Sequence, residues 1–83
     1  MDNLHVGDYV FFARVVKSCD VYEVLKLKLR TVDHDTGWFV GFDVKTKITF
    51  LFNGDDIGKI IFINKNDAKS VVKTAKKTRK EVN

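Results

Sequence analysis

Three features of this 83-residue chain predict a mainly β fold with one C-terminal α-helix. Short segments rich in β-branched and aromatic residues recur between residues 9 and 63, and clusters of Gly, Asp and Asn separate them. From residue 65 onward the apolar residues change to helical spacing. The chain has the length of one domain, residues 1–83, in which a single core takes up the apolar side chains.

Five strands are expected, over residues 9–16, 21–32, 38–44, 47–52 and 59–63. In the second strand leucine alternates with lysine or arginine, so Leu25, Leu27 and Leu29 are expected to face the core. The same alternation predicts the inward residues of the next two strands, which are Trp38, Val40, Phe42, Val44, Ile48, Phe50 and Phe52. The residues expected to be buried together at the centre are Trp38, Leu27, Phe50 and Ile48.

A meander of five short strands with a compact turn before the last one is typical of a small barrel of the SH3-like type. Closure of the sheet hides its edges. The alternative is a strongly curved antiparallel sheet covered by the helix, because the helix must bury its apolar side chains on something.

The helix is predicted over residues 65–82. Asn64 is placed to cap its first turn, and Asp67, three residues later, is placed to complete a capping box. Its apolar stripe consists of Ala68, Val71, Val72, Ala75 and Val82. A second stripe, about 130° away, consists of Lys65, Lys69, Lys73, Lys76 and Lys80. One side of the helix is therefore expected to dock on the sheet while another is cationic.

Charge is segregated along the chain. Residues 65–83 carry seven basic and two acidic side chains, a net charge of +5. Residues 1–64 carry eight basic and nine acidic side chains, a net charge of −1. A near-neutral body with a cationic helix favours an anionic partner.

The segment from Asp56 to Val71 resembles part of a known group of proteins. It reads Asp-Ile-Gly-Lys-Ile-Ile-Phe-Ile-Asn, followed by Lys-Asn-Asp-Ala-Lys-Ser-Val. This order of an acid-Ile-Gly-Lys turn, a short strand, a polar cap and a helix is similar to the C-terminal part of small uncharacterised bacterial and phage-encoded proteins. The resemblance implies an SH3-like barrel with a C-terminal helix, and it implies no known activity. This helix is rich in lysine where the helices it resembles carry more glutamate.

The sequence has no catalytic or metal-binding pattern, so we expect a protein that is not an enzyme and that needs no cofactor. Asp35-Thr36-Gly37 matches the tripeptide of aspartic proteases, but its neighbours are those of a hairpin turn. His5, His34 and Cys19 lack the paired spacing of zinc ligands.

A cytoplasmic location, in a bacterial cell or an infected host cell, is expected. The single Cys19 favours a reducing compartment. The apolar runs are too short to span a bilayer, and the first residues are not those of a signal peptide. We therefore expect no membrane partner.

Two surfaces are candidate sites for DNA or RNA. The first, on the helix, comprises Lys69, Lys73, Lys76, Lys77 and Lys80. The second, on the outer face of the sheet, comprises Tyr22, Lys26, Lys28 and Arg30, joined by Phe39 of the neighbouring strand. Small barrels bind single strands with such combinations, because aromatic rings stack on bases while lysines contact phosphates. The alternative is that the polar side chains only solvate this face and that Tyr22 and Phe39 lie under the helix.

The sequence thus favours a non-enzymatic nucleic-acid-binding accessory protein of low sequence specificity. The alternative is a protein-interaction module, such as an inhibitor of a host nuclease complex encoded by a phage or another mobile element. The working surface of that module would be the acidic turns, which contain Asp33, Asp35, Asp55 and Asp56.

Overall fold

The structure is a computed structural model that describes the backbone of residues 4–82 and the side chains of residues 4–78. Its elements in chain order are β1 (Tyr9–Val16), η1 (Lys17–Cys19), β2 (Val21–Val32), β3 (Trp38–Asp43), β4 (Thr49–Asn53), η2 (Gly54–Asp56), β5 (Ile61–Phe62) and α1 (Lys65–Val82). The two η elements are single turns of 3-10 helix. β1, β2 and α1 have the expected bounds, whereas β4 starts two residues late and β5 is shortened to two residues.

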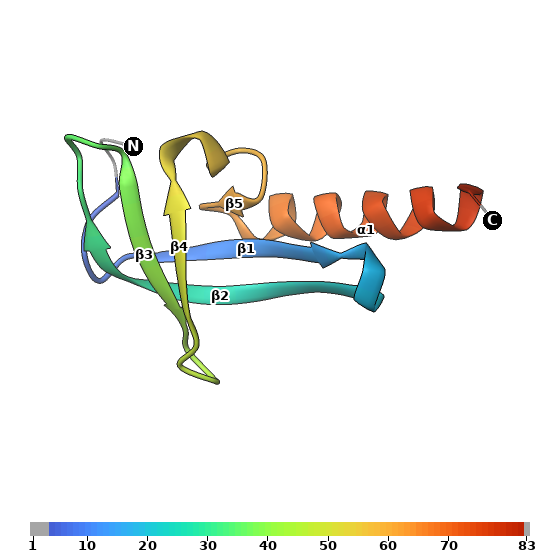
Figure 1. Cartoon of the computed structure of the whole chain (residues 1–83), viewed down its shortest axis with the longest axis horizontal. Coiled ribbons are helices and arrows are strands. Elements are labelled where there is room, and N and C mark those ends of the chain that lie inside the picture. Colours follow the sequence, from blue (N-terminus) through green and yellow to red (C-terminus); the bar gives the residue numbers. More distant parts are fainter. Residues whose placement is uncertain (1–3, 83) are drawn as a thin grey trace.

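The five strands form one antiparallel sheet in the order β4-β3-β2-β1-β5. The sheet curls into a half-barrel, and α1 runs alongside the long β1–β2 ribbon (Figure 1). The predicted fold class, mainly β with five strands and a C-terminal helix, is confirmed, and the sheet takes the strongly curved form that was the alternative to a small SH3-like barrel. A β-bulge between Leu29 and Thr31, with Arg30 as the extra residue, adds to the bend of β2.

The main core lies on the concave face of the curled sheet. Its buried side chains are Leu4, Val10, Leu27, Leu29, Phe39, Phe52 and Ile61. Phe12 packs edge-on against Phe52 and Phe50, with ring centroids 4.9 and 5.3 Å apart, and such pairs add to the burial of apolar area. The inward orientation expected for Leu27, Phe50 and Phe52 is therefore confirmed.

The orientation expected for β3 is wrong. Trp38 is 45% exposed, and the residues of β3 that face the core are Phe39, Gly41 and Asp43. A side chain at Gly41 would crowd the concave side, since a Cβ there would lie 3.3 Å from Leu27 Cβ. The carboxylate of the inward Asp43 accepts hydrogen bonds from the backbone N–H groups of Lys45, at 2.7 Å, and Thr46, at 3.4 Å.

The residues on either side of the β3–β4 turn also differ from expectation. Ile48 is 57% exposed because the turn continues to Lys47, whose φ is +67°, and β4 begins only at Thr49. Val44 follows the end of β3 and is half-buried. The expected burial of Trp38 and Ile48 at the centre of the core is therefore wrong.

A second, smaller core lies on the convex face, where α1 packs on β1 and β2. Ala13, Ala68 and Val72 are buried there, and the half-buried residues around them are Phe11, Val15, Tyr22, Val24, Phe62 and Val71. Asn64 Oδ1 accepts a hydrogen bond from Asn66 N–H at 2.8 Å, the capping contact expected of it. Small alanines at the contact let the helix approach the strands closely. Within residues 4–82, no helix combines the length and the apolar composition needed to cross a bilayer.

Candidate functional site

The part of the convex face that α1 leaves uncovered carries a row of residues across four strands. Tyr9 of β1 lies opposite Lys28 of β2, which lies opposite Phe42 of β3, which lies opposite Thr49 of β4. Cross-strand partners share a face of the sheet, so the row is continuous. We call this surface the open half of the convex face; it comprises Tyr9, Lys26, Lys28, Thr31, Trp38, Val40, Phe42, Thr49 and Leu51.

Lysine ammonium groups lie over the rings of this surface. Lys26 Nζ is 4.5 Å and Lys28 Nζ is 6.0 Å from the centroid of the Tyr9 ring. Lys47, in the adjoining turn, places its Nζ 5.5 Å from the centroid of the Phe42 ring. Each such contact is worth about 0.5 to 1 kcal/mol at an exposed site. The contacts hold the cations close to aromatic faces, the pairing that a nucleotide with its base and phosphate requires.

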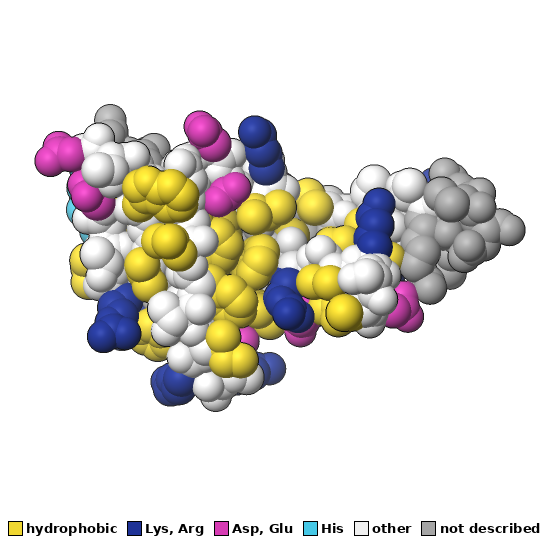
Figure 2. Space-filling view, viewed as in Figure 1, with side chains coloured by type: hydrophobic (Ala, Val, Ile, Leu, Met, Phe, Trp, Pro, Cys, Tyr) yellow, Lys and Arg dark blue, Asp and Glu magenta, His cyan; other side chains and the backbone are white. Residues whose placement is uncertain are grey.

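The other end of the same surface is apolar. Trp38 is 45% and Leu51 is 64% exposed, and Val40 lies beside Leu51 in the register of β3 and β4. Figure 2 shows hydrophobic side chains gathered over the β3–β4 hairpin, with lysine or arginine side chains beside and below it. An exposed indole ring at this end offers a flat surface on which a base can stack.

The structure separates the residues that the sequence assigned to the outer face of the sheet. Lys26 and Lys28 do lie on the open half of the convex face. Arg30 is exposed at the bulge. Tyr22 is half-buried beneath α1, and Phe39 is 1% exposed in the concave core. The outer position predicted for Phe39 is therefore wrong, and Tyr22 lies where the structural alternative put it.

The aromatic residues of the surface, Tyr9, Trp38 and Phe42, and the adjoining Lys47 escaped the sequence reasoning. Tyr9 stands three positions before Phe12 and has the opposite parity, so the alternation of β1 puts the two rings on opposite faces of the sheet. Trp38 and Phe42 were assigned to the core because alternation along β3 puts its larger apolar residues, Trp38, Val40 and Phe42, on one face. Lys47 was counted as the first residue of a strand, whereas it belongs to the turn.

The cationic stripe of α1 begins next to this surface. Lys69, Lys73, Lys76 and Lys77 are exposed, and the side chain of Lys80 lies outside the described residues. Lys65 lies on the same stripe, one helical turn before Lys69 and two before Lys73. It lines a groove together with Lys26 of β2. The two surfaces predicted separately thus adjoin at Lys26 and Lys65.

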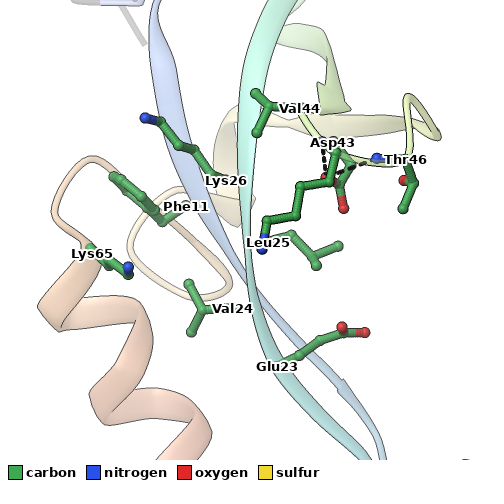
Figure 3. A pocket seen from close by; sticks show the side chains of 10 residues that line it. Phe11, Glu23, Val24, Leu25, Lys26, Asp43, Val44, Thr46 and Lys65 are labelled. Atoms are coloured by element: carbon green, nitrogen blue, oxygen red, sulfur yellow. Dashed lines mark hydrogen bonds between the residues drawn. The ribbon is translucent and has the colours of Figure 1, made fainter.

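That groove, of about 400 Å³, runs past the edge of β2. It is bounded by residues 23–26 of β2, residues 43–46 after β3, Phe11 and Lys65. In Figure 3, Phe11, Val24 and Lys65 lie on one side of β2, while Leu25 and Asp43 lie on the other. The groove therefore has lining residues on both faces of β2 along its edge.

The acidic residues proposed for protein binding are used partly within their own turns. Asp33 Oδ1 accepts hydrogen bonds from Asp35 N–H at 3.0 Å and Thr36 N–H at 3.3 Å. Hydrogen bonds from the Thr36 side chain and from these two backbone groups hold the pKa of Asp33 below its ordinary value. Asp56 Oδ2 accepts from Asn53 N–H at 3.0 Å and so completes the capping box of η2, whose N-cap is Asn53, while Asp35 and Asp55 are exposed.

Other chemistry finds little support in the part of the chain that the structure describes. His5 and His34 place their ring centroids 6.1 Å apart, but no three His, Cys, Asp or Glu residues of the described chain are arranged to hold a metal ion. Cys19 is a free, exposed thiol in η1. Comparisons of the chain with models of protein families, with curated proteins and with solved structures gave no match. The resemblance to small bacterial and phage-encoded proteins stays a prediction.

Proposed function

We propose that this protein is a non-enzymatic accessory protein that binds single-stranded DNA or RNA on the open half of the convex face. The observation that carries the proposal is the row of Tyr9, Lys28 and Phe42 with Lys26 and Lys47 held over its rings. Bases would stack on the rings and phosphates would meet the ammonium groups. Such contacts discriminate little between nucleotide sequences, so low sequence specificity is expected.

Two further features support the proposal. Trp38 extends the aromatic surface at one end, and the exposed lysines of α1 extend the cationic surface at the other. From Lys65 to Lys77 the helix is about 18 Å long at 1.5 Å per residue, which is long enough to follow several nucleotides. The exposed free thiol of Cys19 fits the reducing cytoplasm in which we place the protein.

Trp38 is the single tryptophan of the chain, so its fluorescence reports directly on this surface. Titration with oligo-dT and oligo-U at about 50 mM salt should quench it, and the logarithm of the binding constant should fall with the logarithm of salt by about 0.7 per neutralised phosphate. Tyr9→Ala should weaken binding by about 1 to 3 kcal/mol, the range for one stacked base. Tyr9→Phe is the matched control, because it keeps the ring and should bind nearly as well.

Lysine variants locate the phosphate contacts. Lys28→Gln and Lys47→Gln should each lower the salt slope by about 0.7, which is the loss of one phosphate contact. Lys59→Gln removes the same charge from the exposed turn before β5 and should leave the slope unchanged. Absence of binding to any single- or double-stranded nucleic acid at about 50 mM salt, where such contacts are strongest, would overturn the proposal. The protein-interaction module would then be the better reading.

A further inference from the structure

The edge of β2 is open at Val24, on the side away from β1. β3 pairs with β2 only from Leu27 onward, and the last bond between them joins Val44 N–H to Lys26 C=O at 3.1 Å. Ala13, the partner of Val24 in β1, donates its N–H to Ile60 C=O and so points away from β2. Because directly opposed antiparallel residues alternate in their bonding, the N–H and C=O of Val24 point toward the open edge. Among the described residues, no strand pairs with that side of Val24.

The surroundings of this edge are cationic. Lys26, Lys45 and Lys65 all line the groove along it. The acidic groups of the groove are already engaged. Glu23 Oε2 accepts a bond from Arg14 Nη1 at 2.8 Å, and the Asp43 carboxylate accepts the N–H groups of its own turn. The three lysines outnumber the two carboxylates, and Glu23 is also paired with Arg14, so the net charge of the groove is positive.

We propose that this edge binds an extended acidic peptide segment of a partner protein, which adds to the sheet as a further strand beside Val24. In strand addition the backbone of the peptide supplies both the acceptor for the Val24 N–H and the donor for the Val24 C=O, while side-chain contacts select the sequence. The two sides of β2 favour a peptide in which acidic and apolar side chains alternate. Phe11, Lys26 and Lys65 lie on the side of the convex face, where acidic side chains fit, and Leu25 lies on the other side, where apolar side chains fit.

A peptide fits this site better than a nucleic acid does. A peptide strand presents an N–H and a C=O at the spacing of the Val24 groups, whereas a nucleotide presents its phosphate acceptors and its hydroxyl or amino donors at other spacings. The outer edge of β4, residues 49–53, has no charged side chain that would select a partner by charge. The proposal is independent of nucleic-acid binding, although both sites include Lys26.

The test uses the whole protein and two synthetic probes, a short peptide alternating glutamate with valine and its counterpart alternating lysine with valine. Isothermal titration should detect binding of the glutamate peptide only. Amide exchange followed by NMR should show Val24 N–H protected when this peptide is bound. Methylation of the peptide nitrogen that faces Val24 C=O should weaken binding about tenfold, the effect of one lost hydrogen bond with its unsatisfied partner.

Variants of the protein separate this site from the nucleic-acid surface. Val24→Pro removes the N–H that faces the edge, a change that edge strands tolerate, and should weaken peptide binding about tenfold while oligonucleotide binding persists. Val24→Thr keeps both the N–H and the β-branched shape and should bind the peptide normally. Lys45→Glu should weaken peptide binding several-fold, whereas Lys59→Glu, the same change outside the groove, should not. Trp38→Ala should leave the peptide affinity unchanged.

Three outcomes would overturn the proposal. The first is equal binding of the two peptides, because charge would then not select the partner. The second is binding that leaves the exchange of Val24 N–H unchanged. The third is protection of Val24 N–H by an oligonucleotide, or by a second copy of the chain in a dimer seen by sedimentation, which would assign the edge to another occupant. If Val24→Pro does not fold, the proposal is tested on the wild-type protein by the amide exchange of Val24 N–H and by the affinity of the N-methylated peptide.

Discussion

The two faces of the curled sheet bury their side chains in different ways. On the concave face the strands pack against one another, and Phe39, Leu27 and Ile61 are each 1% exposed or less. On the convex face burial depends on α1, which covers Ala13 and its neighbours and leaves the open half to solvent. The concave face therefore holds the sheet together, and the convex face is the one that remains available for partners.

The residues of β3 show the difference between the two faces most directly. Phe39 and Trp38 are adjacent in sequence and similar in apolar area, yet one is 1% and the other 45% exposed. A large exposed aromatic residue contributes little to stability, while its ring remains free to meet a ligand. Neighbours in sequence thus divide between folding and proposed binding according to the face they occupy.

The largest expected effect tests that division. Phe39→Ala should lower the free energy of unfolding by about 3 to 5 kcal/mol, because it leaves a cavity among Leu27, Leu29 and Phe52. Trp38→Ala should cost about 1 kcal/mol or less, in the range of surface substitutions. Urea unfolding followed by circular dichroism measures both.

A chain of this size has a total stability of about 4 to 12 kcal/mol, so the alanine variant at position 39 can be largely unfolded. Phe39→Leu keeps most of the volume and gives a measurable intermediate value. An equal loss in Trp38→Ala and Phe39→Ala would contradict the orientation of β3 described above.

The difference between β2 and β3 explains how far the sequence predicts the fold. β2 alternates leucine with lysine, so hydrophobicity alone identifies its inward side, and Leu27 and Leu29 are buried as expected. β3 turns its more apolar face, with Trp38, Val40 and Phe42, outward and places Phe39, Gly41 and Asp43 inward. The reasons for that are the close approach of Leu27 to Gly41 and the turn that Asp43 caps, and both depend on contacts between segments rather than on alternation.

The sequence predicted a surface that combines basic and aromatic residues, but it identified only some of the residues that form it. The interleaving of basic and aromatic residues on β2 indicated the face on which Lys26 and Lys28 lie. The aromatic members are different, because α1 covers Tyr22 and the register of β1 and β3 brings Tyr9 and Phe42 beside Lys28. The open edge of β2 depends on where β3 turns away, which local sequence patterns do not reveal.

An intermediate effect is expected where α1 covers the convex face. Val72 is 9% exposed and packs with Ala13 and Ala68. Val72→Asp introduces a charge into this apolar contact and should destabilise the docked helix by about 2 to 3 kcal/mol. An isolated helix of this length is marginal in water, so undocking should also unfold it.

Amide exchange across residues 68–78 should therefore accelerate in Val72→Asp, and the helical circular dichroism signal should fall. The fluorescence of Trp38, on the uncovered part of the face, should not change. Lys73→Asp makes a charge change at the exposed neighbouring position and is the control. Unchanged exchange in Val72→Asp would mean that the helix does not depend on this contact.

The smallest effect is expected at Asp33, in the turn that joins β2 to β3 between the two faces. Its pKa is lowered in the folded protein by the hydrogen bonds of Thr36 and Asp35, so the folded state binds fewer protons than the unfolded chain between the lowered pKa and the ordinary value of about 3.9. The stabilisation is therefore fully present above that ordinary value and is lost as the pH falls through the lowered pKa. Asp33→Asn keeps an acceptor oxygen but removes the charge, so the difference in unfolding free energy between wild type and variant should be constant near neutral pH and disappear in acid.

Urea unfolding at a series of pH values measures this difference, in which the contributions of all other carboxylates cancel. Asp35→Asn, with the same change of charge at an exposed neighbour, should show a smaller pH dependence, and an equal or larger one would remove Asp33 as the residue that stabilises this turn.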